Sequence, residues 1–321
     1  MPGHGGNLDL ALQRFGGHAD DWIDLSTGIN RRAYPLPGLS THAWTALPLR
    51  SDIARLHRAA REAYGTQAPV LAVSGAQSAI QLLPGIAPRG RARVLSPTYG
   101  EFSHAFSVAG WDVDEVSDLA ALAGADLAVV VNPNNPDGRR HAPDELLALA
   151  SRVGRLVVDE SFADPTPDLS LAREAGRPGL LVLRSFGKFY GLAGLRLGFV
   201  LGSAADIASL SAMAGPWPVS GPAIEVGCRA LLDRGWAAAT TARLQRECVR
   251  LDTIALSRGW ALVGGTSLFR LYHTGDAAAA QAQLARAHIW SRIFEKNPAW
   301  LRLGLPGNET EWERVAAALA A

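Results

Sequence analysis

The sequence predicts an α/β protein whose larger part is a mainly parallel, seven-stranded sheet covered by helices. Between residues 70 and 201, short apolar runs, turns and helical segments follow one another repeatedly. The runs are continuously apolar, which is typical of strands buried on both faces. After Ser220 the sequence changes to long helical periods. We therefore expect a large domain over 50–235, and a small α+β domain over 236–321 joined by part of the N-terminal arm, 1–49.

The N-terminal arm is expected to hold one helix and one brief strand, and a second helix follows it. Asn7 can cap an amphipathic helix that glycines 16–17 end, and residues 22–26 suggest a strand. A proline-rich loop then runs to residue 48. Ser51 is expected to cap a helix that stops at Gly65.

The seven strands expected in the large domain are 70–73, 93–95, 113–116, 127–131, 156–158, 180–183 and 197–201. Helices are expected at 76–83 and 101–109. The remaining chain predicts helices at 222–232, 236–257 and 277–287, strands at 261–263, 268–272, 289–294 and 300–305, and a closing helix. Polar residues follow several of the apolar runs. Ligands of such sheets bind beyond the carboxyl ends of the strands, so these positions are candidates for a site.

The composition excludes several classes of partner. A net charge of +1, with 19% charged and 48% hydrophobic residues, indicates no nucleic-acid or membrane partner. Two cysteines are too few for a disulfide framework, and the eight histidines show no spacing typical of metal ligands, so no metal is expected. The N-terminus lacks the blocks of a signal peptide, which favours a cytoplasmic location.

Lys188 is the first chemical candidate. The chain has 31 basic residues, yet its only lysines are Lys188 and Lys296. An amine whose pKa is lowered can attack a carbonyl and form a Schiff base, whereas a guanidinium cannot.

Four motifs surround this lysine in the chain. They are Asn-Pro-Asn-Asn-Pro-Asp-Gly at 132–138, Val-Val-Asp-Glu at 157–160, Ser-Phe-Gly-Lys at 185–188 and Arg-Leu-Gly at 196–198. In this order they resemble the fold-type I pyridoxal-phosphate enzymes, the aspartate aminotransferase superfamily. The resemblance implies pyridoxal 5'-phosphate as the cofactor and a homodimer.

The resemblance also implies catalytic roles. Lys188 would carry the cofactor as a Schiff base, and Asp159 would keep the pyridine nitrogen protonated, which deepens the electron sink. Asn135 would donate to the phenolate oxygen, and the Tyr99 ring would stack on the pyridine. Simpler explanations stay open for three of these residues: a cap for Asp159, an ordinary turn for Asn135 and core packing for Tyr99.

The cofactor phosphate would be bound at a helix start and by two further side chains. Gly75, Ala76 and Gln77 open a helix, whose N–H groups favour an anion. Ser185 and Arg196 match the family's other phosphate ligands, and the arginine would carry much of the anchoring.

Three positions depart from the family pattern. Phe162 stands where a tyrosine often donates to the phenolate, and Leu47-Pro48 where a Tyr-Pro of the partner subunit often reaches the phosphate. Gly187 replaces a hydroxyl residue before the lysine. These changes make a standard aminotransferase less favoured.

Segments 4–7, 24–30 and 300–306 resemble one branch, the threonine-phosphate decarboxylases of cobalamin biosynthesis, which are similar to histidinol-phosphate aminotransferases. The implied reaction is decarboxylation of L-threonine O-3-phosphate to (R)-1-aminopropan-2-yl phosphate. Transamination of the histidinol-phosphate type is the alternative. The substrate would be a small phosphorylated amino acid.

Arg302 would bind a carboxylate or a phosphate of this substrate, with Arg292, His4 and Asn30 completing the anion site. A guanidinium fork suits either anion, so residue type does not separate the two roles. A surface arginine explains Arg292 equally well, and a loop histidine is the simpler explanation of His4.

Two other classes of protein are less favoured by the sequence. Ser185 and Lys188 satisfy the Ser-x-x-Lys of serine acylating enzymes, but no Lys-Thr-Gly follows. A regulator built on this fold would carry a DNA-binding helix-turn-helix, for which the N-terminus has no room.

Overall fold

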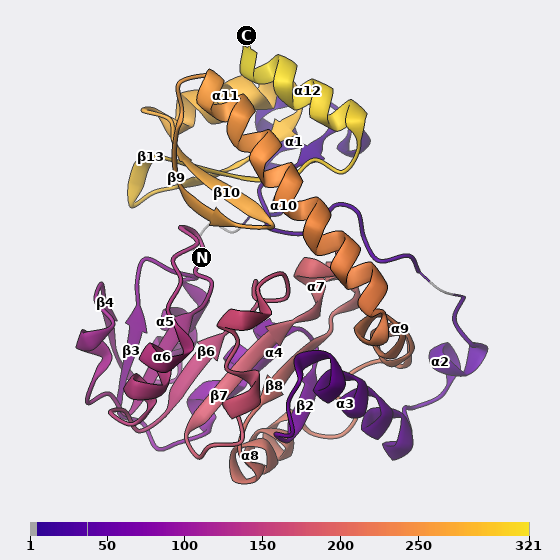
Figure 1. The fold of residues 1–321 in the computed structure, drawn as a ribbon, viewed down its shortest axis with the longest axis vertical. Coiled ribbons are helices and arrows are strands. Elements are labelled where there is room, and N and C mark those ends of the chain that lie inside the picture. Colours follow the sequence, from indigo (N-terminus) through magenta and orange to yellow (C-terminus); the bar gives the residue numbers. More distant parts are fainter. Residues whose placement is uncertain (1–4, 37, 321) are drawn as a thin grey trace. The chain divides into compact units, whose positions relative to one another are not determined.

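The computed structural model describes residues 5–36 and 38–320, which form two compact units (Figure 1). The large unit consists of Tyr34–Asn135 and Arg140–Ala237, and the small unit of Met1–Ala33, Pro136–Arg139 and Ala238–Ala321. The domain limits at 49/50 and 235/236 stay predictions. No helix of the described ranges is long and apolar enough to cross a membrane.

The large unit is built on a seven-stranded sheet of order β2-β8-β7-β6-β5-β3-β4. Only β8 is antiparallel to its neighbours, so the sheet is mainly parallel, as the sequence predicts. The strands are β2 Val70–Val73, β3 Arg91–Leu95, β4 Asp112–Val116, β5 Leu127–Val131, β6 Leu156–Asp159, β7 Leu180–Ser185 and β8 Gly198–Leu201.

Both faces of this sheet are covered. All residues of β5 are buried, although successive side chains point to opposite faces. On one face a core forms between strand residues such as Val129 and helix residues such as Ile80, Phe106 and Leu210. The helices of the large unit are α2 Thr41–Thr45, α3 Arg50–Tyr64, α4 Ala76–Leu82, α5 Glu101–Val108, α6 Pro143–Ala150, α7 Phe186–Phe189, α8 Ala204–Ala214 and α9 Gly221–Leu232.

The small unit contains a four-stranded antiparallel sheet of order β12-β13-β10-β9 and a short parallel pair, β1-β11. Its strands are β1 Ile23–Asp24, β9 Ala261–Thr266, β10 Phe269–His273, β11 Ile289–Trp290, β12 Arg292–Phe294 and β13 Asn297–Gly304. Its helices are α1 Leu8–Phe15, α11 Ala277–Arg286 and α12 Glu309–Ala320; α10 Arg234–Ser257 begins in the large unit.

One predicted helix start is wrong. Ser51 does not cap α3, because the helix already begins at Arg50 and Leu49 is its N-cap. The Asp52 carboxylate accepts from the Leu49 N–H at 3.1 Å and so satisfies an otherwise free donor of the first turn. Helices α2, α6, α7 and α8 were not predicted. Gly65 ends α3 in the left-handed conformation, as expected.

Candidate active site

The candidate cofactor residues of the large unit lie at one edge of its sheet. β2, β5, β6 and β7 point the same way, so their carboxyl ends share this edge. β8 runs in the opposite direction, and its first residue, Gly198, pairs with both Val73 and Ser185. The turn after β2, the end of β7 and the segment before β8 are therefore brought together by register.

Asp159 ends β6, and its side chain is buried. One carboxylate oxygen, Oδ1, accepts from the Ser161 N–H at 2.9 Å and from the Ser161 hydroxyl at 2.5 Å. Burial raises the pKa of Asp159, while these hydrogen bonds and the Lys188 charge oppose the rise. Within the described residues Oδ2 accepts no hydrogen bond. A buried carboxylate with one oxygen held and one available suits a protonated ring nitrogen.

Lys188 lies in α7, directly after β7, and is half-buried. Its Nζ is 5.8 Å from the centre of the Phe162 ring, close enough for a cation–π contact. The Lys188 charge lowers the pKa of Asp159, so the amine lies within electrostatic reach of this carboxylate. The amine and the carboxylate that the sequence predicts as partners are therefore neighbours.

Arg196 lies against Gly75. A Cβ atom at Gly75 would stand 2.7 Å from Arg196 Nη2, so any side chain there would displace the guanidinium. Gly75 has φ +81°, a left-handed conformation that glycine adopts at low energetic cost. Arg196 also lies in the left-handed region, at φ 55°, and its Nη1 donates to the Ala193 carbonyl at 3.0 Å. The result is an exposed cation beside the turn at Gly75.

The remaining predicted phosphate ligands border this turn. Ala76 and Gln77 form the first positions of α4 after Gly75. A Cβ atom at Gly198 would stand 2.5 Å from the Ala76 nitrogen, so the start of β8 packs closely against the start of α4. Ser185 is the N-cap of α7 and is half-buried. The donors of this region suit an anion.

Tyr99 precedes α5 and donates to Gln77 Oε1 at 3.1 Å. Gln77 Nε2 in turn donates to Glu101 Oε2 at 2.7 Å. Burial first, and then the charges of Glu101 and Asp159, raise the pKa of Tyr99 to about 12, while Arg196 opposes the rise. The tyrosine is therefore neutral near neutral pH and lies within electrostatic reach of both predicted cofactor anchors.

Asn135 is half-buried in the loop after β5. Its neighbours fix the loop: Asn132 exchanges two hydrogen bonds with the His141 backbone, and Asn134 accepts from the Thr98 hydroxyl at 2.6 Å. Asn134 also donates to the Pro97 carbonyl at 2.9 Å. The loop is therefore more ordered than the simple turn that would also explain its sequence.

Two of the departures from the family pattern have structural correlates. A Cβ atom at Gly187 would approach the Ala193 Cα to 2.8 Å, which leaves no room for a hydroxyl side chain. Phe162 is buried and faces Lys188. Leu47, at the place of the missing tyrosine, is 63% exposed.

In the small unit Arg302 is buried on β13. Its Nη2 donates to the Ser26 carbonyl at 2.7 Å, and its Cζ lies 5.0 Å from the Phe269 ring centre. Burial first, and then the nearby Arg292 charge, lower the pKa of Arg302 to about 9, against an opposing effect of Asp24. A buried cation beside another cation favours the binding of an anion.

Arg292 is the cross-strand partner of Arg302 in the β12-β13 pair. It is half-buried, and its Cζ lies 5.4 Å from the Phe294 ring centre. Burial lowers the pKa of Arg292 too, although the Glu295 charge opposes this. The structure thus brings the two predicted substrate arginines together.

Asn30 is buried, and its Oδ1 accepts from the Arg32 N–H at 3.1 Å and from Arg243 Nη2 at 2.9 Å. These bonds give Asn30 a structural role in the small unit. His4 lies outside the described residues. The neighbouring Gly6 N–H donates to the Ser26 hydroxyl at 2.7 Å, so this part of the arm lies beside the residue whose carbonyl holds Arg302.

A buried ionic network behind Asp159 was missed by the sequence analysis. Arg184 Nη1 contacts Glu160 at 2.9 Å, and its Nη2 contacts Asp164 at 2.7 Å. Glu160, which is fully buried, also accepts from the Ser170 hydroxyl at 2.5 Å and the Leu171 N–H at 2.6 Å. Breaking such a network leaves an uncompensated buried charge, so it stabilises the β6 and β7 ends.

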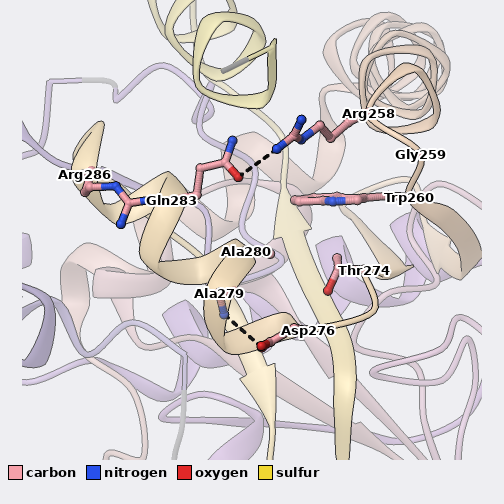
Figure 2. Close-up of a pocket in the computed structure, with 9 residues that line it drawn as sticks. All are labelled: Arg258, Gly259, Trp260, Thr274, Asp276, Ala279, Ala280, Gln283 and Arg286. Atoms are coloured by element: carbon pink, nitrogen blue, oxygen red, sulfur yellow. Dashed lines mark hydrogen bonds between the residues drawn. The ribbon is translucent and has the colours of Figure 1, made fainter.

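Two cavities lie apart from the predicted site residues, none of which lines them. One of about 590 Å³ in the large unit is lined in part by Arg184, Asp164 and Tyr190. Another of about 390 Å³ lies in the small unit, where Figure 2 shows Arg258 reaching Gln283 of α11 and Asp276 reaching the Ala279 amide. No cluster of metal-ligating side chains occurs in the part of the chain that the structure describes.

Comparison with known proteins identifies the family. A family model of class I and II aminotransferases matches residues 41–319. A threonine-phosphate decarboxylase of a Sinorhizobium species is 45% identical, with 99% of this chain and 97% of that protein covered. One of Pseudomonas aeruginosa is 46% identical, with 98% and 96% covered. A histidinol-phosphate aminotransferase of Mycobacterium bovis is 34% identical, with 98% and 87% covered.

Solved structures agree on the fold. Histidinol-phosphate aminotransferase from Sinorhizobium meliloti, solved in complex with pyridoxal-5'-phosphate, superposes with a TM-score of 0.81 at 19% identity, over 99% of this chain and 94% of that one. L-threonine-O-3-phosphate decarboxylase from Porphyromonas gingivalis has a TM-score of 0.74 at 21% identity, over 92% and 98%. Together with the family match, the sheet order and the strand-end motifs, these results establish that the chain belongs to the class I and II aminotransferase family.

Proposed function

We propose that this protein is a pyridoxal-phosphate-dependent decarboxylase. It converts L-threonine O-3-phosphate to (R)-1-aminopropan-2-yl phosphate, a reaction that serves cobalamin biosynthesis. The observation that carries the proposal is the 45–46% identity to two threonine-phosphate decarboxylases over almost the whole chain. In the reaction the Cα–carboxylate bond breaks, carbon dioxide leaves, and Cα gains one proton.

The residues at the carboxyl edge of the large unit fit the cofactor. Asp159 offers a buried carboxylate oxygen that is not used within the described residues, which suits a ring N–H. Gly75 leaves a space that a Cβ would fill, directly beside the Arg196 guanidinium, which suits a phosphate. Lys188 supplies the amine, and the cofactor, when bound, supplies an electron sink for the bond that breaks.

Each residue then has a physical task. Arg196, Ser185 and the amides of Ala76 and Gln77 would hold the phosphate. Asp159 would keep a proton on the ring nitrogen, Asn135 would donate to the phenolate oxygen, and the Tyr99 ring would stack on the pyridine. Lys188 Nζ would deliver the proton to Cα, and general acid catalysis of this kind is worth about 10²–10⁴-fold.

The arginine pair of the small unit supports an anionic substrate. Arg302 and Arg292 are cross-strand partners, and both are at least half-buried. Like charges at such positions destabilise a sheet. An anion neutralises the pair, so a substrate that carries both a phosphate and a carboxylate suits this position. We assign Arg302, with Arg292 beside it, to substrate binding; His4 and Asn30 stay predicted members of the same site.

A second function is transamination of the histidinol-phosphate type, which the 34% identity to the M. bovis protein favours. The two reactions differ in which Cα bond breaks, and the bond perpendicular to the cofactor ring is the one that does. Because both reactions need the same cofactor residues, the decision rests on how the substrate anions are held.

A paired assay tests the two functions. With L-threonine O-3-phosphate, the decarboxylase releases one carbon dioxide per amine formed and consumes no keto acid. With histidinol phosphate and 2-oxoglutarate, it forms no glutamate. Stoichiometric glutamate formation without release of carbon dioxide from threonine phosphate would favour the aminotransferase and reject the decarboxylase.

We also propose a cytoplasmic homodimer. Three large apolar side chains shortly before the start of α3 are more than half exposed: Trp44, Leu47 and Leu49. Exposed large apolar side chains close together in the chain are typical of an interaction surface. Light scattering during gel filtration should give twice the mass of 34.0 kDa, and a fully active monomer would reject the dimer.

A further inference from the structure

A chain of hydrogen bonds links a buried carboxylate to the Tyr99 ring. Glu101 is only 9% exposed and accepts from Gln77 Nε2 at 2.7 Å. The other end of the same amide, Oε1, accepts from the Tyr99 hydroxyl at 3.1 Å. Gln77 therefore bridges Glu101, the first residue of α5, and Tyr99, which lies two residues before it.

The carboxylate determines which way the amide faces. An amide side chain can present its oxygen or its nitrogen to a given neighbour, and the two orientations exchange donor and acceptor. A carboxylate only accepts, so Glu101 selects the orientation that turns Nε2 toward it. Oε1 must then face Tyr99, and the tyrosine hydroxyl must donate. A charge-assisted bond of this kind is roughly twice as strong as a neutral one.

The ring of Tyr99 is thereby held at two points. Its hydroxyl is fixed by Gln77, and its edge packs against the fully buried Phe102 ring, with centroids 6.5 Å apart and planes at 83°. Gln77 is the second residue of α4, after Gly75 and Ala76, so the residue that holds the ring also lies beside the predicted phosphate position. A change at Glu101 would alter the position of the Tyr99 ring through the Gln77 side chain.

We propose that Glu101 is a positioning residue for the cofactor: by orienting the Gln77 amide, it holds the Tyr99 ring in the place where that ring stacks on the bound pyridine. This inference rests on the proposed function, because it requires that pyridoxal phosphate binds at this edge of the sheet. Glu101 itself touches neither cofactor nor substrate in this role. Its effect passes through the Tyr99 hydroxyl, and this makes the role separable from ordinary support of the fold.

A double-mutant cycle tests the proposal. The dissociation constant of pyridoxal phosphate is measured by fluorescence titration of apoprotein for the wild type, Glu101→Gln, Tyr99→Phe and the double variant. Glu101→Gln can no longer select one amide orientation, and we expect its dissociation constant to rise about 5- to 10-fold, since an effect of this size corresponds to the loss of one ordinary hydrogen bond, here that of the Tyr99 hydroxyl. In the Tyr99→Phe background, where no hydroxyl depends on Gln77, the same change should alter it less than about twofold.

Matched controls make the outcome decisive. Ser103, another residue of α5, donates its hydroxyl to Glu115 of β4 at 2.9 Å. Glu115→Gln removes the charge from this bond and should leave the dissociation constant unchanged. Gln77→Leu breaks the bridge in another way and should reproduce the cycle if Glu101→Gln does not fold. The kcat of Glu101→Gln should be lower than that of the wild type, by a larger factor than the change in KM.

Three results would overturn the inference. The first is an equal effect of Glu101→Gln in both backgrounds, which means general support of the fold. The second is no effect of Glu101→Gln on cofactor affinity in the wild-type background. The third is an effect of Glu115→Gln as large as that of Glu101→Gln. A wild-type protein that does not bind pyridoxal phosphate at all would instead reject the proposed function.

Discussion

Arg292 and Arg302 stand directly opposite each other on neighbouring antiparallel strands, and burial lowers the pKa of both, that of Arg302 to about 9. Two cations at such positions repel each other, and a bound anion would neutralise them. On stability grounds alone the pair is unfavourable, and it leads to the first prediction.

Arg302→Gln should lower kcat/KM for threonine phosphate by about 10²–10³-fold, because a buried charge-assisted contact to the substrate is lost. The melting temperature of the protein without substrate should rise, since the repulsion with Arg292 is removed. Steady-state kinetics and calorimetry measure both effects. Arg286→Gln, a change of an exposed arginine in the same unit, is the control and should alter neither. Unchanged kinetics in Arg302→Gln would contradict the assignment.

Lys188→Ala should abolish the visible absorbance of the protein with cofactor and the adduct that borohydride reduction fixes to the chain. The reason is that only an amine can carry the cofactor covalently, and the chain has one other lysine. Mass spectrometry of reduced, digested protein should find the adduct on the peptide of Lys188. Lys296→Ala should keep colour and adduct. An adduct on Lys296 in the wild type would reject this role for Lys188.

Asp159→Asn should stabilise the protein without cofactor at neutral pH and lower its affinity for the cofactor. Burial raises the pKa of Asp159, so the folded protein binds a proton there at a higher pH than the unfolded chain does, and the charged form costs stability above that pH. Asparagine keeps the acceptor for Ser161 and removes the charge.

The difference in the free energy of unfolding between Asp159→Asn and the wild type should depend on pH. As the pH falls through the raised pKa, the wild-type carboxyl group becomes neutral and the difference between the two proteins should shrink. Urea unfolding at several pH values measures it. A wild type that is more stable than Asp159→Asn at neutral pH, without cofactor, would contradict the prediction.

Gly75→Ala should raise the dissociation constant of pyridoxal phosphate by about tenfold or more, because the new methyl group would displace Arg196 from the phosphate position and one charge-assisted bond is worth about 1.5–3 kcal/mol. Gly124→Ala is a matched control. Gly124 has nearly the same φ, +80° against +81°, but a Cβ there meets nothing within 4 Å. Both variants therefore place an alanine at a positive φ, but only the new methyl group at residue 75 meets the Arg196 guanidinium, so only the first variant should lose cofactor affinity. Equal affinities in the two variants would reject the assignment of Gly75 and Arg196 to the cofactor phosphate.

Most of the large-unit fold could be predicted because its strands are short, continuous apolar runs. Residues 127–131 were predicted as a strand and are one, and residues 70–73 likewise. The start of α3 was placed wrongly at Ser51, because serine and a nearby aspartate both favour a helix start and only the backbone shows that Asp52 satisfies the first donor.

The candidate site could be predicted where its residues follow strands in the chain. Asp159 and Lys188 are examples, and their roles stay predictions until they are tested. The Arg184 network could not be predicted, because Arg184 reads as a single charge at the end of an apolar run. Its partners Glu160 and Asp164 come from another segment, and their pairing depends on the β6-β7 register.

Strand β8, which runs antiparallel to its two neighbours in the sheet of the large unit, has a consequence for the entropy of binding. Gly198 pairs with Val73 on one side and Ser185 on the other, so three segments around the predicted phosphate position are tied by ladder hydrogen bonds of the sheet. Groups held in this way lose little freedom when a ligand arrives, and preorganisation of this kind raises affinity without any additional contact. A long, flexible connection between β7 and β8 would remove that advantage, even if all the predicted phosphate ligands were still present in the sequence.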